Sequence, residues 1–189
     1  MGDLSVTTAR LRLVPATVEH LDVELQAPGR LSDLLGAIVP AGWPPGLYDR
    51  DAIAFFHARL TEAGPAAVGW YAWYAIRRAT AGPAVLVASG GYFGPPGSDG
   101  AVEIGYSVVP DYCGQGYATE LVGALTNHAL RLAGVRRVVA EADERNAASL
   151  KVLERSGFVR VGAGRETGHA RFACEIESPL RGTRKGRVN

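Results

Sequence analysis

The chain has 189 residues, of which 47% are hydrophobic and 21% charged, and its formal net charge is +1. This length and composition are typical of one globular domain with a full hydrophobic core, and they exclude a disordered chain. The near-neutral charge gives no overall attraction to nucleic acid or to an anionic membrane surface, so the sequence predicts neither as a partner.

The first third predicts one strand followed by helices. Alternating apolar residues indicate a half-buried strand at residues 11–15. Thr17 is a typical N-cap for a helix that extends to about residue 26. Two further helices are expected, at residues 31–35 and 51–62, on either side of a proline- and glycine-rich loop at residues 40–46 that cannot form regular structure.

From residue 70 onwards the pattern changes to strands. Only short turns separate the first three, so they predict an antiparallel meander. The order of elements predicts a single-domain α/β (α+β) fold with a mixed, mostly antiparallel sheet flanked by helices. The expected elements are strands at 70–77, 85–92 and 102–109, a helix at 117–132, a strand at 135–141, a helix at 147–156, and strands at 158–162 and 170–177.

A glycine-containing loop joins the third meander strand to the long helix that follows. Gly114 and Gly116 allow backbone N–H groups there to converge on an anion, and the helix N-terminus adds partial positive charge. The pattern predicts a phosphate or pyrophosphate site that needs neither lysine nor metal. A Rossmann dinucleotide loop fits less well, because Thr119 replaces its third glycine and the preceding strands form a meander.

Glu103, on the strand that leads to this loop, is the candidate general base. Strand alternation places Glu103, Gly105 and Ser107 on one face and Tyr106 on the other. A strand covered by helices rarely buries an unpaired glutamate. We therefore expect Glu103 either to pair with an arginine or to line a wet cleft.

Two segments resemble the GNAT superfamily of N-acetyltransferases, and more narrowly its ribosomal-protein-alanine acetyltransferase (RimJ/RimL-like) type. The opening residues 8–13 also resemble the first strand of that group. The resemblance spans residues 8–178, which are the expected acetyltransferase domain. The two segments are Glu103-Ile104-Gly105-Tyr106 with Tyr112-Cys113-Gly114-Gln115-Gly116-Tyr117-Ala118-Thr119-Glu120, and Asn146-Ala147-Ala148-Ser149-Leu150-Lys151-Val152-Leu153-Glu154-Arg155-Ser156-Gly157-Phe158.

The resemblance implies acetyl-CoA as cosubstrate and a primary amine, on a protein N-terminus or a small molecule, as acceptor. A backbone N–H of Val108 or Val109 could serve the oxyanion. The resemblance also places Trp43, Glu103 and Tyr106 on the substrate side, although Trp43 could equally be a packing residue. The residues it implies for the cofactor are Ser107, Val108, Val109, Gly114, Gln115, Gly116, Tyr117, Ala118, Thr119, Asn146 and Ser149.

Two positions depart from the family pattern. Asp111 stands where relatives often have Gln or Arg, and it adds nothing to anion binding. Leu153 occupies the position of a tyrosine that in many relatives protonates the leaving thiolate, which makes Ser149 the second catalytic candidate. Ser149 could instead be bonded only locally, and Asn146 could act only as a helix cap. A non-catalytic acyl-CoA-binding or regulatory module is therefore the alternative function.

The remaining features predict no further site. The four histidines lack metal-ligand spacing, so we expect no metal. Cys113 and Cys174 are expected to be free thiols, and with no signal peptide or membrane-spanning run the sequence predicts a cytoplasmic protein. Residues 179–189 are expected to form a basic, disordered tail. A homodimer is possible, since dimers are common in the family that the chain resembles.

Overall fold

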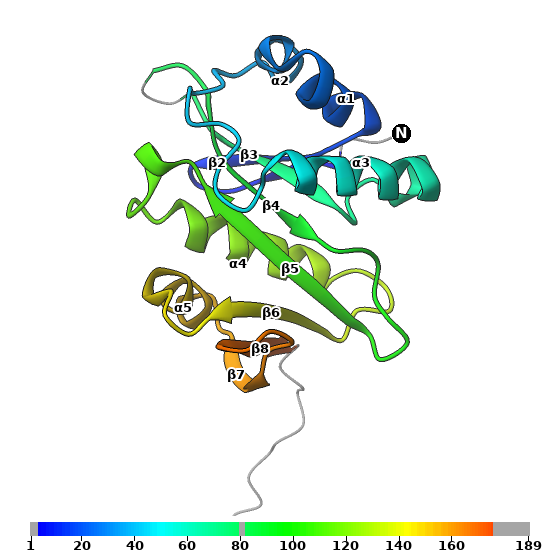
Figure 1. The fold of residues 1–189 in the computed structure, drawn as a ribbon, viewed down its shortest axis with the longest axis vertical. Coiled ribbons are helices and arrows are strands. Elements are labelled where there is room, and N and C mark those ends of the chain that lie inside the picture. The colour runs from blue at the N-terminus through cyan, green and yellow to red at the C-terminus, as the bar shows by residue number, and fades with distance from the viewer. Residues whose placement is uncertain (1–3, 80–81, 176–189) are drawn as a thin grey trace, which may run out of the picture.

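An eight-stranded sheet in the order β1-β2-β3-β4-β5-β6-β8-β7 organises the computed structural model, which describes residues 4–79 and 82–175 (Figure 1). The mixed, mostly antiparallel sheet flanked by helices confirms the predicted fold class. The tail expected at residues 179–189, and the end of the strand expected at 170–177, lie outside the described residues. Within the described ranges, no helix combines the length and apolar character that crossing a membrane requires.

The first half of the chain follows the predicted pattern closely. Thr17 caps the first helix, and His20 completes a capping box with it, so a histidine ring nitrogen replaces the usual carboxylate. The two-residue strand β1 was not predicted, because two residues carry no periodicity. The elements are β1 (Val6–Thr7), β2 (Leu11–Pro15), α1 (Val18–Gln26), a 3-10 turn (Pro28–Arg30), α2 (Leu31–Leu35), α3 (Arg50–Ala63) and a second 3-10 turn (Pro65–Ala67).

The second half also has the predicted order, with shifted boundaries. The helix expected to reach residue 132 ends at Ala129, because the N–H groups of Arg131 and Leu132 bond in short turns to His128 and Ala129. The elements are β3 (Ala72–Arg77), β4 (Val85–Tyr92), β5 (Ala101–Val108), a 3-10 turn (Pro110–Tyr112), α4 (Tyr117–Ala129), β6 (Arg137–Asp143), α5 (Ala147–Arg155), β7 (Val159–Ala163) and β8 (His169–Glu175).

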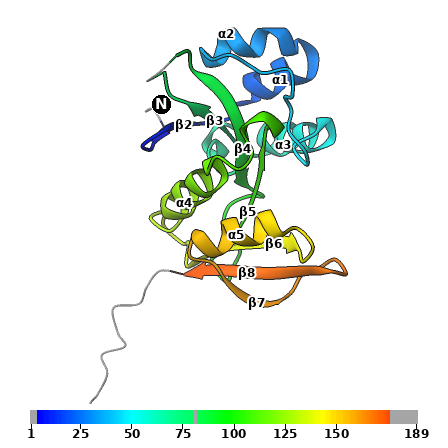
Figure 2. The same cartoon turned by 90° about the vertical axis from the view of Figure 1, so that its left-hand side faces the viewer.

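The sheet is covered on both faces. Figure 2 shows α4 and α3 on opposite sides of the central strands. On the first side, Leu121 and Leu125 of α4 and Leu153 of α5 are fully buried in one hydrophobic core. On the other side, α1, α2 and α3 enclose a second core around Tyr74 and Leu86. Each fully buried leucine contributes about 1.5–3 kcal/mol to folding, so both layers hold the sheet firmly.

The strands β5 and β6 part in the middle of the sheet, as Figure 1 shows. Their parallel pairing covers only residues 101–103 of β5 and 137–139 of β6. Beyond Glu103, β5 continues alongside β4 on one edge, whereas β6 continues alongside β8. In the described part of the chain, the edge of β5 over residues 104–108 therefore has no strand partner on the β6 side. The N-terminal end of α5 lies close to it, since Ser149 bonds to Tyr106.

Candidate functional site

The glycine loop after β5 leaves a group of backbone donors free. Gly114 and Gly116 have φ angles of 73° and 81°, in the left-handed region that costs other residues about 1–2 kcal/mol. Gly116 is the N-cap of α4 and provides no side chain to cap it. Among the described residues no hydrogen bond involves the N–H groups of Gly114, Gln115 or Gly116. With the first-turn N–H groups of α4, they suit an anion.

Arg10, which no sequence pattern identified, lies directly before β2 and braces this loop. Its Nη1 donates to the Gln115 carbonyl at 2.8 Å, and its guanidinium lies 4.6 Å from the centre of the Tyr117 ring. Its Nε donates to Glu120 at 2.7 Å, and the same carboxylate accepts from Thr8 at 2.6 Å. Arg10 and Glu120 both belong to segments that resemble the family, but 110 residues separate them. No local sequence pattern could therefore reveal the pair.

Tyr106 on β5 reaches the N-terminal end of α5. Its hydroxyl lies 2.8 Å from Ser149 Oγ and 3.3 Å from the Ser149 carbonyl oxygen. Burial raises the pKa of Tyr106, although the bond with Ser149 lowers it. Asn146 caps the helix by accepting from the Ser149 N–H at 3.0 Å. Leu153, at the tyrosine position of many relatives, is fully buried in the core and cannot serve a reaction there.

Glu103 is ion-paired with an arginine, which is one of the two arrangements that the sequence predicts for it. Its Oε1 accepts from Arg165, which lies in the turn between β7 and β8. Arg165 also bonds through Nε to Glu141 at 3.2 Å, and Glu141 accepts from Arg171 at 2.7 Å. The charge of Glu103, followed by that of Glu141, raises the pKa of Arg165. The Glu103 side chain remains 20% exposed, which leaves it open to solvent at one side.

The two faces of β5 separate as alternation predicts. Tyr106 packs with the core under α4 and α5. On the opposite face, a Cβ added at Gly105 would lie 3.1 Å from the Phe93 ring. A Cβ added at Gly46 would lie 2.6 Å from Ser107 Oγ. Residues 40–46 therefore cross the β5 face that carries Glu103, whereas Ser149 approaches from the other side.

Trp43 points inward from that loop. It is half-buried, and its indole N–H donates to Glu24 Oε1 at 2.7 Å. This hydrogen bond gives Trp43 a structural role, and its contact with a substrate stays a prediction. The roles predicted for Glu103, Ser149 and the cofactor-binding residues also remain predictions, although the fold brings Ser149 to β5, the strand that carries Glu103.

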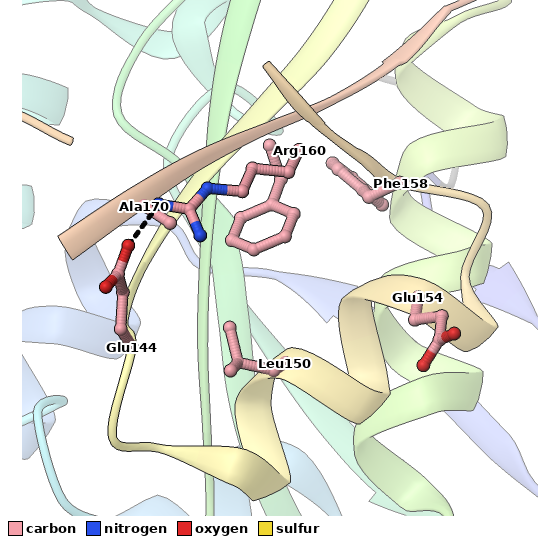
Figure 3. Close-up of a pocket in the computed structure, with 7 residues that line it drawn as sticks. Glu144, Leu150, Glu154, Phe158, Arg160 and Ala170 are labelled. Carbon is pink, nitrogen blue, oxygen red and sulfur yellow. Dashed lines mark hydrogen bonds and ion pairs between the residues drawn. The ribbon is translucent and has the colours of Figure 1, made fainter. Parts of the chain in front are cut away.

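A separate cavity of about 480 Å³ opens between α5 and the strands β7 and β8. Figure 3 shows Arg160 reaching across it to Glu144, with Leu150 on the helix side. None of the predicted site residues lines it, and we assign it no role. The lining residues are Glu144, Leu150, Glu154, Phe158, Arg160, Ala170 and Phe172.

The thiols and possible metal ligands add no further site. Cys113 is an exposed free thiol beside the glycine loop, and its Sγ lies 3.7 Å from the Val109 carbonyl oxygen. Cys174 is also free, and burial raises its pKa. In the part of the chain that the structure describes, no group of three or more His, Cys, Asp or Glu side chains could hold a metal ion.

The chain belongs to the acetyltransferase (GNAT) domain family, whose model matches residues 10–159. It is 28% identical over 152 residues to the uncharacterized N-acetyltransferase YjdG of Bacillus subtilis, covering 80% of this chain and 88% of that protein. The fold is similar to ribosomal-protein-S5-alanine acetyltransferase from Vibrio fischeri (TM-score 0.63, 18% identity, 93% and 98% covered). It is also similar to Mycobacterium smegmatis RimJ in complex with CoA-disulfide (TM-score 0.63, 18% identity, 93% and 88% covered).

The Arg10–Glu120 brace makes stability depend on pH. Burial by itself raises the pKa of Glu120, but bonds from Thr8 and Arg10 outweigh it, and the pKa lies below its ordinary 4.5. The stabilisation is therefore complete above about pH 4.5 and is lost as pH falls through the folded value. We expect Glu120→Gln to lower the free energy of unfolding by about 1 kcal/mol at pH 7 and by less at about pH 3.

Urea denaturation of both proteins at the two pH values measures this difference. Glu62→Gln is the control, because its side chain is 74% exposed and, within the described ranges, pairs only with Arg59 one helical turn away. That substitution should change the free energy of unfolding by less than about 0.5 kcal/mol at either pH. A Glu120→Gln effect of equal size at pH 7 and pH 3 would show that the carboxylate charge does not contribute.

Proposed function

We propose that the protein is an N-acetyltransferase that moves an acetyl group from acetyl-CoA to a primary amine by direct attack. Membership of the family supports acetyl transfer in general. The observation that carries the finer proposal is the unpaired edge of β5, which has the free donors of the glycine loop at its end and the Tyr106–Ser149 pair beside it. One extended thioester could bind along this whole path.

Acetyl-CoA is the proposed cosubstrate. Its pantetheine arm would add to the free edge of β5 beside Ser107 and Val108 as an extra strand, since β6 leaves that edge unpaired. Val109, which the sequence also predicted for the cofactor, cannot extend this pairing, because its N–H donates to Val87 and its carbonyl accepts from Tyr112. Its pyrophosphate would accept from the N–H groups of residues 114–118, with the Thr119 hydroxyl close by in sequence. The CoA-disulfide bound to the M. smegmatis RimJ supports this ligand class. No metal enters the proposal.

Ser149 and Tyr106 are proposed to serve the leaving thiolate. When the amine nitrogen bonds to the acetyl carbon and the carbon–sulfur bond breaks, the sulfur needs a proton. Ser149 Oγ would give it and be reprotonated by Tyr106, whose hydroxyl is 2.8 Å away. The raised pKa of Tyr106 keeps the phenol protonated at neutral pH. A tyrosine from β5 would thus supply the proton source that Leu153 cannot.

Glu103 is proposed to receive the proton that the amine loses. It lies on the β5 face opposite Tyr106, so the amine and the thioester would meet from opposite sides of the strand. Arg165 would hold the carboxylate in place, and the partly exposed side chain would take the proton through solvent. The backbone N–H of Val108 would serve the developing oxyanion, because the Val109 N–H already donates to the Val87 carbonyl at 2.9 Å. Positioning the two reactants supplies most of the rate enhancement.

The acceptor is proposed to be a protein N-terminal amine or a small-molecule amine, in a cytoplasmic protein that acts as a monomer or homodimer. The ribosomal-protein acetyltransferases among the structural neighbours favour the first acceptor class. Trp43 and Tyr106 lie on the two sides of β5 and would border the amine and the thioester respectively. We propose residues 8–178 as the catalytic domain.

Thiol release from acetyl-CoA over a panel of N-terminal peptides and small amines tests the function. We expect release with at least one acceptor class and thermal stabilisation by acetyl-CoA alone. Stabilisation without turnover on every acceptor would favour the acyl-CoA-binding module. An absence of stabilisation would contradict both functions.

Two glycine variants show whether the cosubstrate uses the glycine loop. Gly116→Val and Gly134→Val both force a β-branched residue into the left-handed region, at φ 81° and 86°, so both should lose stability. Only Gly116→Val should also weaken acetyl-CoA binding, by at least about tenfold in calorimetry. Equal affinity in the two variants would show that Gly116 is only structural.

Substitution of Glu103 tests the proton acceptor. Glu103→Gln should lower turnover about 10²-fold at pH values below the pKa of the amine, where a proton must be removed, and less above it. Acetyl-CoA affinity should stay nearly unchanged. The matched control is Glu141→Gln, which removes the other carboxylate bound to Arg165 but should keep the wild-type pH profile. An unchanged profile for Glu103→Gln would reduce Glu103 to a structural partner of Arg165.

Substitution of Ser149 and Tyr106 tests the proton donor. Ser149→Ala should lower kcat about 10²-fold and Tyr106→Phe at least about tenfold, because each interrupts proton delivery to the thiolate. The dissociation constant of acetyl-CoA should change by less than about threefold in both. Ser156→Ala, at the opposite end of α5, is the control with wild-type kcat. Wild-type kcat in Tyr106→Phe would leave Ser149 without its proposed proton source.

A further inference from the structure

Glu24 is a buried carboxylate that the proposed chemistry does not use. It lies on α1 and is 7% exposed. Its Oε1 accepts from Trp43 Nε1 at 2.7 Å, and its Oε2 accepts from the hydroxyls of Tyr48 at 2.8 Å and Tyr74 at 2.5 Å. Burial raises the pKa of Glu24, and the three bonds partly oppose this. A buried carboxylate with three donors is costly to assemble and holds its partners in one geometry.

Those three donors join two different parts of the fold. Tyr74 belongs to β3 and is fully buried in the second core. Trp43 and Tyr48 belong to residues 40–48, which contain no helix or strand of their own. The Trp43 ring lies 5.5 Å from that of Tyr48 and 6.1 Å from that of Tyr74, centre to centre. Glu24 therefore fastens an irregular loop to the centre of the sheet.

The fastened loop crosses β5 at the reacting end. A Cβ added at Gly42 would lie 3.3 Å from Val109 and 3.5 Å from Pro110. Gly46 approaches Ser107 closely on the β5 face that carries Glu103. The next residue, Leu47, has 89% of its surface exposed. The loop thus leaves one large apolar side chain uncovered next to the strand where the amine would meet the thioester.

We propose that Glu24 is a positioning residue for the amine acceptor, holding residues 40–48 as one wall of the acceptor site and presenting Leu47 to the group that carries the amine. The proposal rests on the proposed function. The expected acceptor carries an apolar group next to its amine. An irregular loop of this length loses considerable conformational entropy when ordered, and the bonds to Glu24 offset that loss. Without them, Trp43 and Tyr48 would have to find partners elsewhere.

Three substitutions test the role of Glu24 and its partner. Glu24→Leu removes both acceptor oxygens, and we expect it to raise the KM of the amine about tenfold while kcat and acetyl-CoA affinity change little. Glu24→Gln should lie closer to wild type, because the amide oxygen can accept from Trp43 and the amide nitrogen can donate to the two tyrosine hydroxyls. Trp43→Phe removes a single donor and should raise KM by a smaller factor, and it serves if Glu24→Leu does not fold.

Tyr92→Phe is the control for lost stability. Its hydroxyl donates to the Leu125 carbonyl at 2.6 Å in the core under α4, away from residues 40–48. This variant also loses one buried hydrogen bond, but the KM of an amine should stay at the wild-type value. Leu47→Ala should raise the KM of an amine with an apolar substituent and leave that of methylamine unchanged.

Amide hydrogen exchange of residues 40–48 gives a readout that does not depend on activity. We expect faster exchange there in Glu24→Leu than in Tyr92→Phe. Unchanged exchange or an unchanged amine KM in folded Glu24→Leu would overturn the proposal, as would an equal rise of KM in Tyr92→Phe. If the wild-type protein acetylates no amine, the proposed function fails and so does the acceptor role, while exchange still shows whether Glu24 holds the loop.

Discussion

The short parallel contact between β5 and β6 is the constraint on which the rest of the site depends. A parallel pair that stops after residues 101–103 leaves β5 with one paired and one free edge, because β4 continues beside it and β6 does not. The core under α4 and α5 packs against one face of the strand, and residues 40–46 approach the other face. The glycine loop, Ser149 and Glu103 all take their positions from this one strand.

Long-range polar contacts then fix the parts around that strand. Arg10 comes from one side of the sheet to hold the glycine loop, and Arg165 comes from the β7–β8 turn to hold Glu103. Glu24 on α1 holds residues 40–48 by accepting hydrogen bonds from Trp43 and Tyr48. In each case a charged side chain from one element holds a residue or a loop of another. Charged bonds of this kind are stronger than neutral ones and restrict geometry more, which suits a site that depends on positioning.

The Tyr106–Ser149 pair brings a phenol to α5 from a different element of the fold. The sequence places Leu153 where many relatives have a tyrosine, and Leu153 is fully buried. The phenol that lies near the start of α5 comes instead from β5, on the strand face opposite Glu103. A comparison of helix positions alone would therefore miss a hydroxyl that the fold brings from β5 to Ser149 on α5.

Apart from the two-residue β1, the sequence by itself determined the order and type of the elements, the two covered faces and the glycine loop, because periodicity, helix caps and left-handed glycines are local properties. It also determined that Glu103 and Tyr106 point to opposite sides of β5, since alternation is local too. Only the tertiary structure decided which partners these residues have. Arg165 lies 62 residues from Glu103, and Tyr74 lies 50 residues from Glu24. Such pairs form because the core packs their elements together, and no short-range pattern in the sequence encodes that packing.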